Sequence, residues 1–222
     1  MNNGKPKRRT QESRSAETRA RALETAIRLL YERGYAATNI LTVAAEAGIS
    51  RGALQHQFPT RVDLMLHVVR TVYDEEIALY REQLGKISDP RERVLAFPEI
   101  AWDVLSRPRG VAVLEILQGS RSDPELATRL RPMQMEIERD SISIATSVAS
   151  EAGMDAAAPG VRLVVWAIRG LSVAQLLVEK PGEIRKSVRL LRNLLKLALD
   201  SEQPAKATPP EPAFRVIGKL KQ

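Results

Sequence analysis

The sequence predicts an all-α protein, and two observations support this prediction. Apolar residues recur with a period of about 3.6 residues along most of the chain, whereas no segment shows sustained strict alternation of apolar and polar residues. Residues that start and stop helices divide this periodic pattern into segments of helical length. A chain of 222 residues, of which 44% are apolar and 27% charged, is also long and apolar enough to bury a core. We therefore expect a helical globular protein.

Three short helices are expected before residue 60. The first spans about 17–33 and ends at Gly34, because glycine adopts the left-handed conformation that follows a helix at little cost. The second begins after Asn39, whose side chain can accept hydrogen bonds from exposed backbone N–H groups, and it ends at Gly48. The third begins at Ser50 and is ended by the Phe-Pro pair before residue 60.

Longer helices are expected in the rest of the chain. Thr60 and Asp63 have the spacing of a capping box, which opens a fourth helix. Asp89-Pro90 and Asp123-Pro124 each combine a capping aspartate with proline at the first helical position, where its missing N–H costs nothing. The expected helices of this part are 60–86, one that starts at Pro90, 109–119, 124–153, 158–179 and 183–200, the last two separated by Pro181-Gly182.

Composition excludes several classes of protein. No run of 18 uninterrupted apolar residues occurs, and the polar, basic first residues are followed by no apolar segment typical of a secretory signal, so we expect a cytoplasmic protein. The absence of cysteine excludes disulfides, thiolate metal sites and cysteine nucleophiles. The chain also lacks a glycine-rich phosphate loop and an H-E-x-x-H pair. We expect neither an enzyme, nor a metal site, nor a bound cofactor.

Positive charge is concentrated at the ends of the chain. Residues 1–60 contain 10 Lys and Arg against 5 Asp and Glu, residues 61–200 contain 20 against 20, and residues 201–222 contain 4 against 2. A basic N-terminal quarter favours a polyanionic partner, because Lys and Arg gain affinity for phosphates by releasing condensed counterions. The alternative is a solvated basic tail without a partner. The cluster that would reach a nucleic acid consists of Lys5, Lys7, Arg8, Arg9 and Arg14.

Residues 39–58 have the pattern of a helix-turn-helix. Two helices that cross steeply need a small residue where they approach, which Ala44 supplies, and Gly48 permits the sharp turn between them. The apolar residues Val43, Ile49, Leu54 and Phe58 are expected to point inward. The small, polar and basic residues are left to face outward and suit the major groove of DNA. They are Arg51, Gly52, Ala53, Gln55, His56 and Gln57.

Residues 18–66 resemble the N-terminal domain of TetR-type transcriptional regulators. The strings that carry the resemblance are TRARALETAIRLLYERGYAATNI, VAAEAGISRGAL and FPTRVDLML, which cover about a fifth of the chain, and the remainder matches only in helix number, length and order. Together with the composition of the two ends, the resemblance divides the chain into four expected parts. They are a flexible basic arm at 1–15, a three-helix DNA-binding domain at 16–59, a larger helical effector-binding and dimerisation domain at 60–200, and a flexible tail at 201–222.

The resemblance also assigns DNA contacts. It implies that Arg51 and His56 contact DNA from the recognition helix, that Arg61 contacts a phosphate, and that Thr38 contacts the DNA backbone. Many members carry tyrosine where this chain has Gln55, so that contact is missing. Glutamine can instead pair with adenine, or this exposed side chain can contact nothing. The arginines and His56 also have the alternative of being ordinary surface residues.

A single recognition helix contacts few base pairs, so we expect a homodimer on a palindromic site. The final two helices are more apolar than one packed layer requires, although these side chains can also fill the core of a monomer. The residues expected at the dimer interface are Val161, Val164, Val165, Ile168, Leu171, Ile184, Val188, Leu191 and Leu195.

The family pattern also implies a small-molecule pocket among the helices of 61–152. Pro98 and Pro132 are expected to kink two of these helices. Large apolar residues at helical spacing are candidates for its lining, and also for an ordinary core. The candidates are Phe97, Trp102, Leu105, Leu117, Met133, Met135, Ile137 and Trp166, with Asp103, Glu115, Gln118 and Arg169 as polar groups.

We expect, overall, a DNA-binding repressor that a small-molecule effector releases from its operator. The alternative is a helical protein that binds a ligand or partner and does not use its N-terminal domain on DNA.

Overall fold

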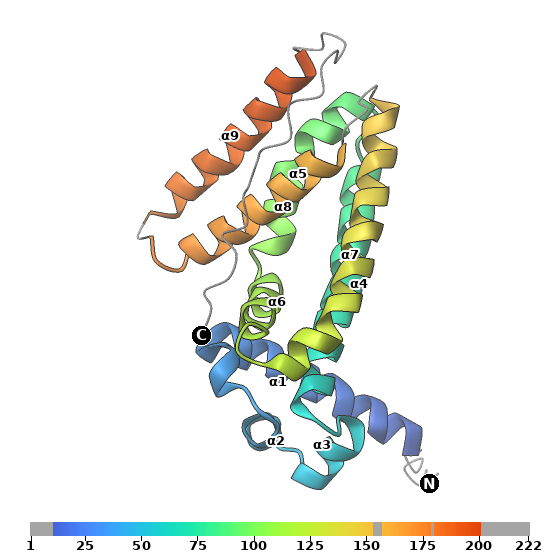
Figure 1. Cartoon of the computed structure of the whole chain (residues 1–222), viewed down its shortest axis with the longest axis vertical. Helices are drawn as coiled ribbons and strands as arrows, with labels where there is room; N and C mark the ends of the chain where they lie inside the picture. Colours follow the sequence, from blue (N-terminus) through green and yellow to red (C-terminus); the bar gives the residue numbers. More distant parts are fainter. Residues whose placement is uncertain (1–10, 153–156, 179, 201–222) are drawn as a thin grey trace, which may run out of the picture.

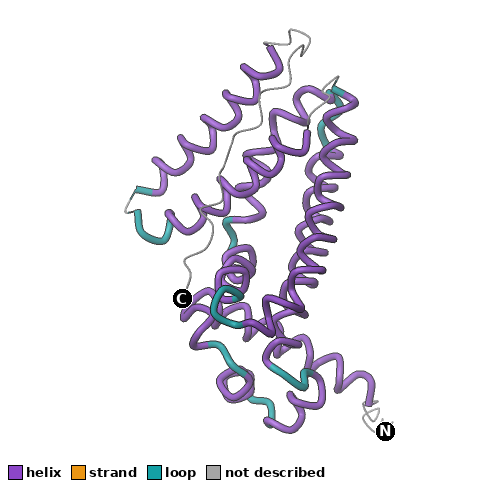
Figure 2. The backbone as a smooth tube through the Cα atoms, viewed as in Figure 1, coloured by secondary structure: helices purple, strands orange, loops and turns teal. Residues whose placement is uncertain are grey.

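The computed structural model describes residues 11–152, 157–178 and 180–200, and within these ranges every regular element is a helix (Figure 1 and Figure 2). This confirms the predicted all-α class. The expected arm and tail, except for residues 11–15, lie outside the described residues. The helices are α1 (Gln11–Ala37), α2 (Ile40–Ala47), α3 (Arg51–Gln57), α4 (Arg61–Gly85), α5 (Pro90–Leu105), α6 (Pro108–Gly119), α7 (Pro124–Glu151), α8 (Ala157–Ala174) and α9 (Pro181–Asp200).

The predicted capping residues are confirmed one by one. Asn39 accepts from the backbone N–H groups of Leu41 and Thr42 at the start of α2, and Ser50 accepts from Ala53 at the start of α3. The remaining predicted caps share the same geometry, in which a side-chain oxygen accepts from the third backbone N–H of the helix. These caps are Thr60 on α4, Asp89 on α5 and Asp123 on α7.

Three boundaries differ from the sequence prediction. α1 begins at Gln11, so residues 11–15 are helical and do not belong to a flexible arm. α8 ends at Ala174, and α9 begins at Pro181, so that Pro181-Gly182 opens α9 rather than separating the two helices. Proline is favourable at a helix start because its N–H would have no partner there. α5 and α7 each continue past the proline inside them.

The helices form two groups of different composition (Figure 1). α1, α2 and α3 lie at one end of the molecule, where α1 packs against α6 and its core is continuous with α4, α6 and α7. α5 packs against α8 and α9 around a second core that contains Trp102, Val164, Ile168 and Val188. The first group presents a small three-helix unit, and a cavity lies where α5 and α8 of the second group face α4 and α7.

Candidate functional site

The corner between α2 and α3 has the geometry that its sequence predicts. Ala44 is buried at the crossing, and Gly48 has φ +62, the left-handed conformation that glycine adopts easily. The N–H of Ile49 donates to the carbonyl of Ala44 over 2.9 Å, which ties the turn to α2. Leu54 and Phe58 are buried against α1, as expected. The corner therefore holds α3 in a fixed orientation on the rest of the N-terminal unit.

The outer face of α3 carries the residues predicted to face outward. Arg51, Gln55 and His56 are all exposed, and the small residues at positions 52 and 53 leave the helix backbone accessible between them. The Nε of Arg51 donates to Oε1 of Gln55 over 3.2 Å, so these two side chains are aligned along one side of the helix. A short exposed helix with small residues at its centre and polar donors around them fits the major groove.

α1 reaches the end of α3. The hydroxyl of Ser15 donates to Oε1 of Gln57 over 2.9 Å, so Gln57 is half-buried and does not belong to the exposed set. On the other side of the unit, Glu46 accepts from Arg28 and from Arg33, each over 2.8 Å. These hydrogen bonds hold the pKa of the Glu46 carboxyl below its ordinary value. Positive charge on that side is therefore neutralised, whereas Arg51 on α3 faces outward.

The side chains of two residues predicted to contact DNA have partners within the chain. Thr38 is fully buried, and its hydroxyl donates to the carbonyl of Gly34 over 2.9 Å, so its side chain faces no phosphate. The guanidinium of Arg61 stacks over the ring of Tyr35, 3.8 Å from the ring centroid, and donates to the carbonyl of Tyr35. Both side chains hold the end of α1 in place, because the chain reverses direction there and leaves polar backbone groups that need partners.

Tyr35 joins the N-terminal unit to the helices above it. Its hydroxyl donates to Oδ2 of Asp123 over 2.7 Å, and its N–H donates to Oε2 of Glu115 over 3.2 Å. The ring lies so close to Gly119 that a Cβ at this position would overlap the ring atoms. Gly34 has φ +76 immediately before Tyr35, which turns the chain so that the ring points toward α6 and α7. We call Tyr35, Arg61, Glu115, Gly119 and Asp123 the joint.

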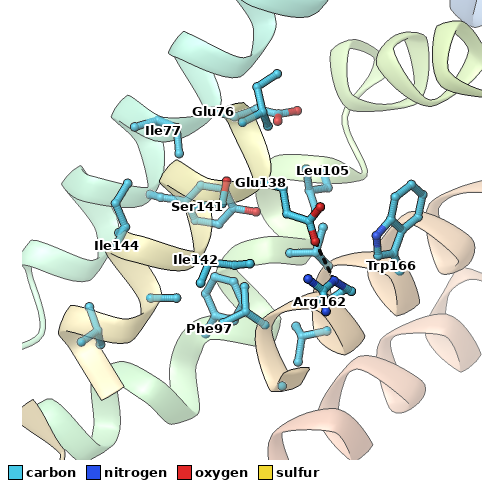
Figure 3. Close-up of a pocket in the computed structure, with 18 of the residues that line it drawn as sticks. Glu76, Ile77, Phe97, Leu105, Glu138, Ser141, Ile142, Ile144, Arg162 and Trp166 are labelled. Carbon is cyan, nitrogen blue, oxygen red and sulfur yellow. Dashed lines mark hydrogen bonds and ion pairs between the residues drawn. The ribbon is translucent and has the colours of Figure 1, made fainter. Parts of the chain in front are cut away.

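A pocket of about 230 Å³ lies between α4, α5, α7 and α8. Figure 3 shows Glu76 and Ile77 of α4 on one side, with Arg162 and Trp166 of α8 opposite them. Most of the lining is apolar. At the rim, Oε1 of Glu138 accepts from Nε of Arg162 over 2.6 Å. A mostly apolar cavity with a few polar groups is typical of small-molecule sites.

The pocket contains a carboxyl group that sequence analysis missed. Glu76 is 6% exposed, and its Oε2 lies 3.9 Å from Nη2 of Arg169. Burial penalises the charged form and raises the pKa of Glu76 to about 7, although the charge of Arg169 opposes this shift. One turn further along α4, burial also raises the pKa of the Tyr80 hydroxyl. The sequence signal for Glu76 was its place in the apolar stripe of α4, between Val72 and Tyr80.

The pocket includes only some of the predicted lining residues. Phe97, Leu105, Ile137, Trp166 and Arg169 line it. The prediction that Trp102 lines the pocket is wrong, because Trp102 is buried in the core between α5, α8 and α9. Met133 does not line the pocket either and packs against the core of the N-terminal group. The other predicted residues do not line the pocket either, since their helix faces turn toward solvent, another core or the joint. These residues are Asp103, Glu115, Leu117, Gln118 and Met135.

The predicted interface residues divide into two groups. Val164, Ile168, Ile184 and Val188 are buried inside the single chain, so they fill the core of the monomer and are not available to a second copy. The others are partly buried, and Val165, Leu171, Leu191 and Leu195 pack on the same core, while Val161 lines the pocket. The large apolar residues that do face outward on these helices were not predicted as interface residues. They are Leu163, Trp166, Leu190, Leu194 and Leu197.

The described residues contain no helix that is both long enough and apolar enough to cross a membrane. Within the same ranges, no group of acidic and histidine side chains is arranged to hold a metal ion.

Comparison with known proteins finds similarity to transcriptional regulators. Residues 22–68 match the sequence profile of "Bacterial regulatory proteins, tetR family". The chain is 28% identical to the transcriptional regulator CymR of Pseudomonas putida over 77% of this chain and 85% of that protein. The fold matches that of a TetR-family regulator from Streptomyces coelicolor with a TM-score of 0.69, at 21% identity over 83% of this chain and 96% of the other.

A transcriptional regulator from Saccharomonospora viridis, whose structure was determined in complex with choline, has the same fold. It matches with a TM-score of 0.62 and 22% identity, over 82% of this chain and 96% of the other. The curated relatives are named as transcriptional regulators and not as enzymes. The matched profile covers the segment from the middle of α1 to α4, which contains the entire helix-turn-helix. Residues 22–68 of this chain are therefore a DNA-binding domain of the type found in TetR-family helix-turn-helix transcriptional regulators, and the whole chain has the fold of such regulators.

Proposed function

We propose that the protein is a homodimeric repressor that binds a palindromic operator through α3 and is released when a small molecule occupies the pocket. The exposed polar face of α3, mounted on a capped and buried helix-turn-helix, carries this proposal. A regulator of this kind acts where the DNA lies, so we place it in the bacterial cytoplasm.

On the DNA side, Arg51 and His56 are the contacts that we assign to the recognition helix. Both are exposed on the same short helix as Gly52 and Ala53, which allow the helix to approach the bases closely. Gln55 lies beside Arg51 and is assigned to base reading through its amide, which can pair with adenine. We leave Thr38 and Arg61 out of the proposed interface, since the side chain of Thr38 donates to Gly34 and that of Arg61 stacks on Tyr35.

On the dimer side, the outward-facing leucines of α8 and α9 are the proposed contact with a second copy. Leu163 is 67% exposed, Leu190 57% and Leu197 64%, and this much exposed apolar surface on two adjacent helices is unfavourable in water. A two-fold interface buries the same face of both copies and places two α3 helices on one DNA duplex.

On the effector side, the joint links the pocket to the DNA-binding unit. α7 contributes Glu138 to the rim of the pocket and is capped at its other end by Asp123, which accepts from Tyr35 of α1. A ligand that shifts α7 therefore changes the position of α1 and α3. The choline complex of the regulator from Saccharomonospora viridis supports the idea that a chain of this fold holds a small molecule.

The DNA-binding step is tested by fluorescence anisotropy with a labelled duplex that carries a palindrome from upstream of the coding sequence, at rising salt concentration. We expect Arg51→Ala to weaken binding by about 1–3 kcal/mol if the guanidinium contacts a base, or to lower the salt dependence if it contacts phosphate. Arg139→Ala is the matched control, since Arg139 is an exposed arginine on α7 with a side chain 74% exposed. The proposal fails if the wild type does not bind at low salt, or if the two variants behave alike.

A further inference from the structure

Two side chains of α4 that line the pocket each have a polar atom without a hydrogen-bond partner. Glu76 and Tyr80 are one helical turn apart, so their side chains leave the same face of the helix, and both line the pocket. Glu76 is 6% exposed, and Tyr80 packs on the cores around α5 while its ring lies 5.8 Å from that of Phe97. The pocket therefore has a polar patch on an otherwise apolar wall.

The hydrogen-bonding capacity of this patch is not used by the protein. Within the described ranges, no protein group lies within hydrogen-bonding distance of Oε1 of Glu76 or of the hydroxyl of Tyr80. Oε2 of Glu76 has its nearest cation at 3.9 Å, beyond the length of an ordinary hydrogen bond. Buried polar atoms normally have partners, because leaving them without any costs their full desolvation. These two atoms therefore mark where a ligand makes its polar contacts.

When Glu76 is ionised, the charges in the pocket are balanced in pairs. Glu76 faces Arg169 in the interior, Glu138 pairs with Arg162 at the rim, and Arg93, which also lines the pocket, pairs with Glu151 over 2.6 Å. A ligand with a net charge would leave one charge uncompensated among apolar walls, where such a charge is strongly disfavoured. A neutral ligand avoids this cost, and it satisfies both free atoms if its polar group can donate to one and accept from the other.

The apolar part of the pocket limits the size of the ligand. The lining around the patch includes Ile77, Phe97, Leu105 and Val164, which contact hydrocarbon and aromatic groups favourably. A cavity of about 150 Å³ holds one benzene molecule, so the 230 Å³ here has room for a ligand of about the size of a naphthalene ring with a small substituent.

We propose that Glu76 and Tyr80 anchor the hydroxyl group of a neutral, compact, apolar alcohol or phenol, with the hydroxyl donating to Glu76 and accepting from Tyr80. Arg169 keeps the carboxylate of Glu76 charge-balanced, and the surrounding aliphatic and aromatic side chains enclose the hydrocarbon part. This inference rests on the proposed effector role of the pocket and names the chemical class that the pocket selects.

The test compares four bicyclic probes of nearly equal shape. The full-length protein is dialysed to equilibrium against 2-naphthol, naphthalene, 2-naphthoate or 2-naphthylmethylammonium, and the bound fraction is measured. We expect 2-naphthol to bind at least tenfold more tightly than each of the other three. Equal affinity for naphthol and naphthalene overturns the proposal, as does a preference for the anion or the cation, or the absence of binding by all four.

Substitutions locate the preference in the pocket. Tyr80→Phe and Glu76→Leu each remove one anchor and are expected to reduce the preference for 2-naphthol over naphthalene to less than threefold. Glu76→Gln keeps an acceptor in place, so we expect it to retain most of the preference. Glu82→Gln removes an exposed carboxylate on α4 that does not line the pocket, and it is the matched control with an unchanged preference. An unchanged preference in both Tyr80→Phe and Glu76→Leu contradicts the proposal even if the wild type prefers naphthol.

A second readout separates this inference from the proposed function. Saturating 2-naphthol is added to the complex of protein and labelled operator, and anisotropy reports whether DNA is released. Binding with the expected preference but without release supports the anchor and contradicts the effector role of the pocket. Release by naphthalene as strongly as by 2-naphthol supports the effector role and overturns the anchor.

Discussion

The N-terminal unit and the C-terminal helices differ in whether their large apolar side chains are buried within the chain or exposed. In α1, α2 and α3, the large apolar side chains that the period predicts to be inside are inside, and caps satisfy the starts of α2 and α3. In α8 and α9, Leu163, Leu190 and Leu194 face outward although their helices already pack on a core. The first region is complete within one chain, whereas the second presents apolar surface that a partner would cover.

The interior shows the same contrast. Polar side chains around the helix-turn-helix are used within the chain, as Thr38 and Ser50 illustrate. Between α4 and α8, Oε1 of Glu76 and the hydroxyl of Tyr80 have no hydrogen-bond partner among the described residues. We expect a second copy or a ligand in the region whose apolar surface or polar atoms have no partner within the chain, and four variants test this comparison.

The largest effect is expected from charging the outward face of α9. Leu190→Glu combined with Leu194→Glu places two carboxylates where we propose a second copy, so the chain should become monomeric and lose about a hundredfold or more in operator affinity, because two half-sites no longer bind together. Analytical ultracentrifugation and anisotropy measure the two quantities. Met135→Glu is the control, since Met135 is 65% exposed on α7. A double variant that stays dimeric would show that this face is not the interface.

The second-largest effect is expected at the joint, which connects the N-terminal unit to α6 and α7. Gly119→Ala introduces a Cβ into the space of the Tyr35 ring, and we expect it to lower the free energy of unfolding by about 3 kcal/mol, because a packed ring and its hydrogen bond to Asp123 must move. Gly170→Ala is the control, because a Cβ there meets no atom within 4 Å and alanine favours the helix. Urea unfolding measures both. Equal stability of the two variants would contradict the tight packing of the joint.

A smaller, pH-dependent effect is expected from Glu76. Burial raises its pKa from 4.5 to about 7, so the folded chain binds this proton more tightly than the unfolded chain. Stability from this group is complete below pH 4.5, declines as the pH rises toward 7, and stays at its lower value above. Glu76→Gln removes the decline, so its stability relative to the wild type should rise by about 2–3 kcal/mol between pH 4.5 and 8.

Thermal or urea unfolding across this pH range measures the difference. Glu138→Gln, at the rim of the pocket, is the control for the loss of a carboxylate. Stability curves for the wild type and Glu76→Gln that run parallel would show that Glu76 has the same pKa in the folded and the unfolded chain, and would contradict its burial without hydrogen-bond partners.

The smallest effect is expected on the surface of α3. Gln55→Tyr replaces an exposed side chain, so stability should change little, while discrimination at one base position of each half-site should change by about 1–3 kcal/mol. Anisotropy with operators altered at single positions measures this, and binding to unrelated DNA is the internal control. An equal loss on all sequences would assign Gln55 to general backbone contact.

The helices of the N-terminal unit were predicted well from patterns of a few residues, because the interactions that start and end a helix act between residues close together in the sequence. A cap acts within one turn, as at Asn39 and Thr60, and a left-handed glycine such as Gly48 ends a helix wherever it occurs. The outward set on α3 follows from helical period once the inward residues are known. The start of α1 was predicted too late, because a helix without a recognisable cap is extended by the contacts it makes, here that of Ser15 with Gln57.

The errors in the site arise where the decision depends on distant parts of the chain. Thr38 and Arg61 are residue types that often contact phosphates. In the folded chain, however, the hydroxyl of Thr38 donates to the carbonyl of Gly34, and the guanidinium of Arg61 stacks on the ring of Tyr35. Trp102 has the size of a pocket residue, but the packing of α5 on α8 and α9 buries it in a core. Helical period identifies an apolar face without distinguishing a monomer core, a pocket and a dimer surface, because all three are apolar.

The amino-acid sequence by itself determined the all-α class, most helix starts, the helix-turn-helix and the outward residues of α3, since each depends on side chains within a few positions of one another. Only the tertiary structure decided that Val164 and Ile168 fill the core while Leu163 faces outward, and that Glu76 is buried opposite Arg169. These outcomes depend on how helices separated by many residues cross, and the crossing is set by the packing of the entire molecule.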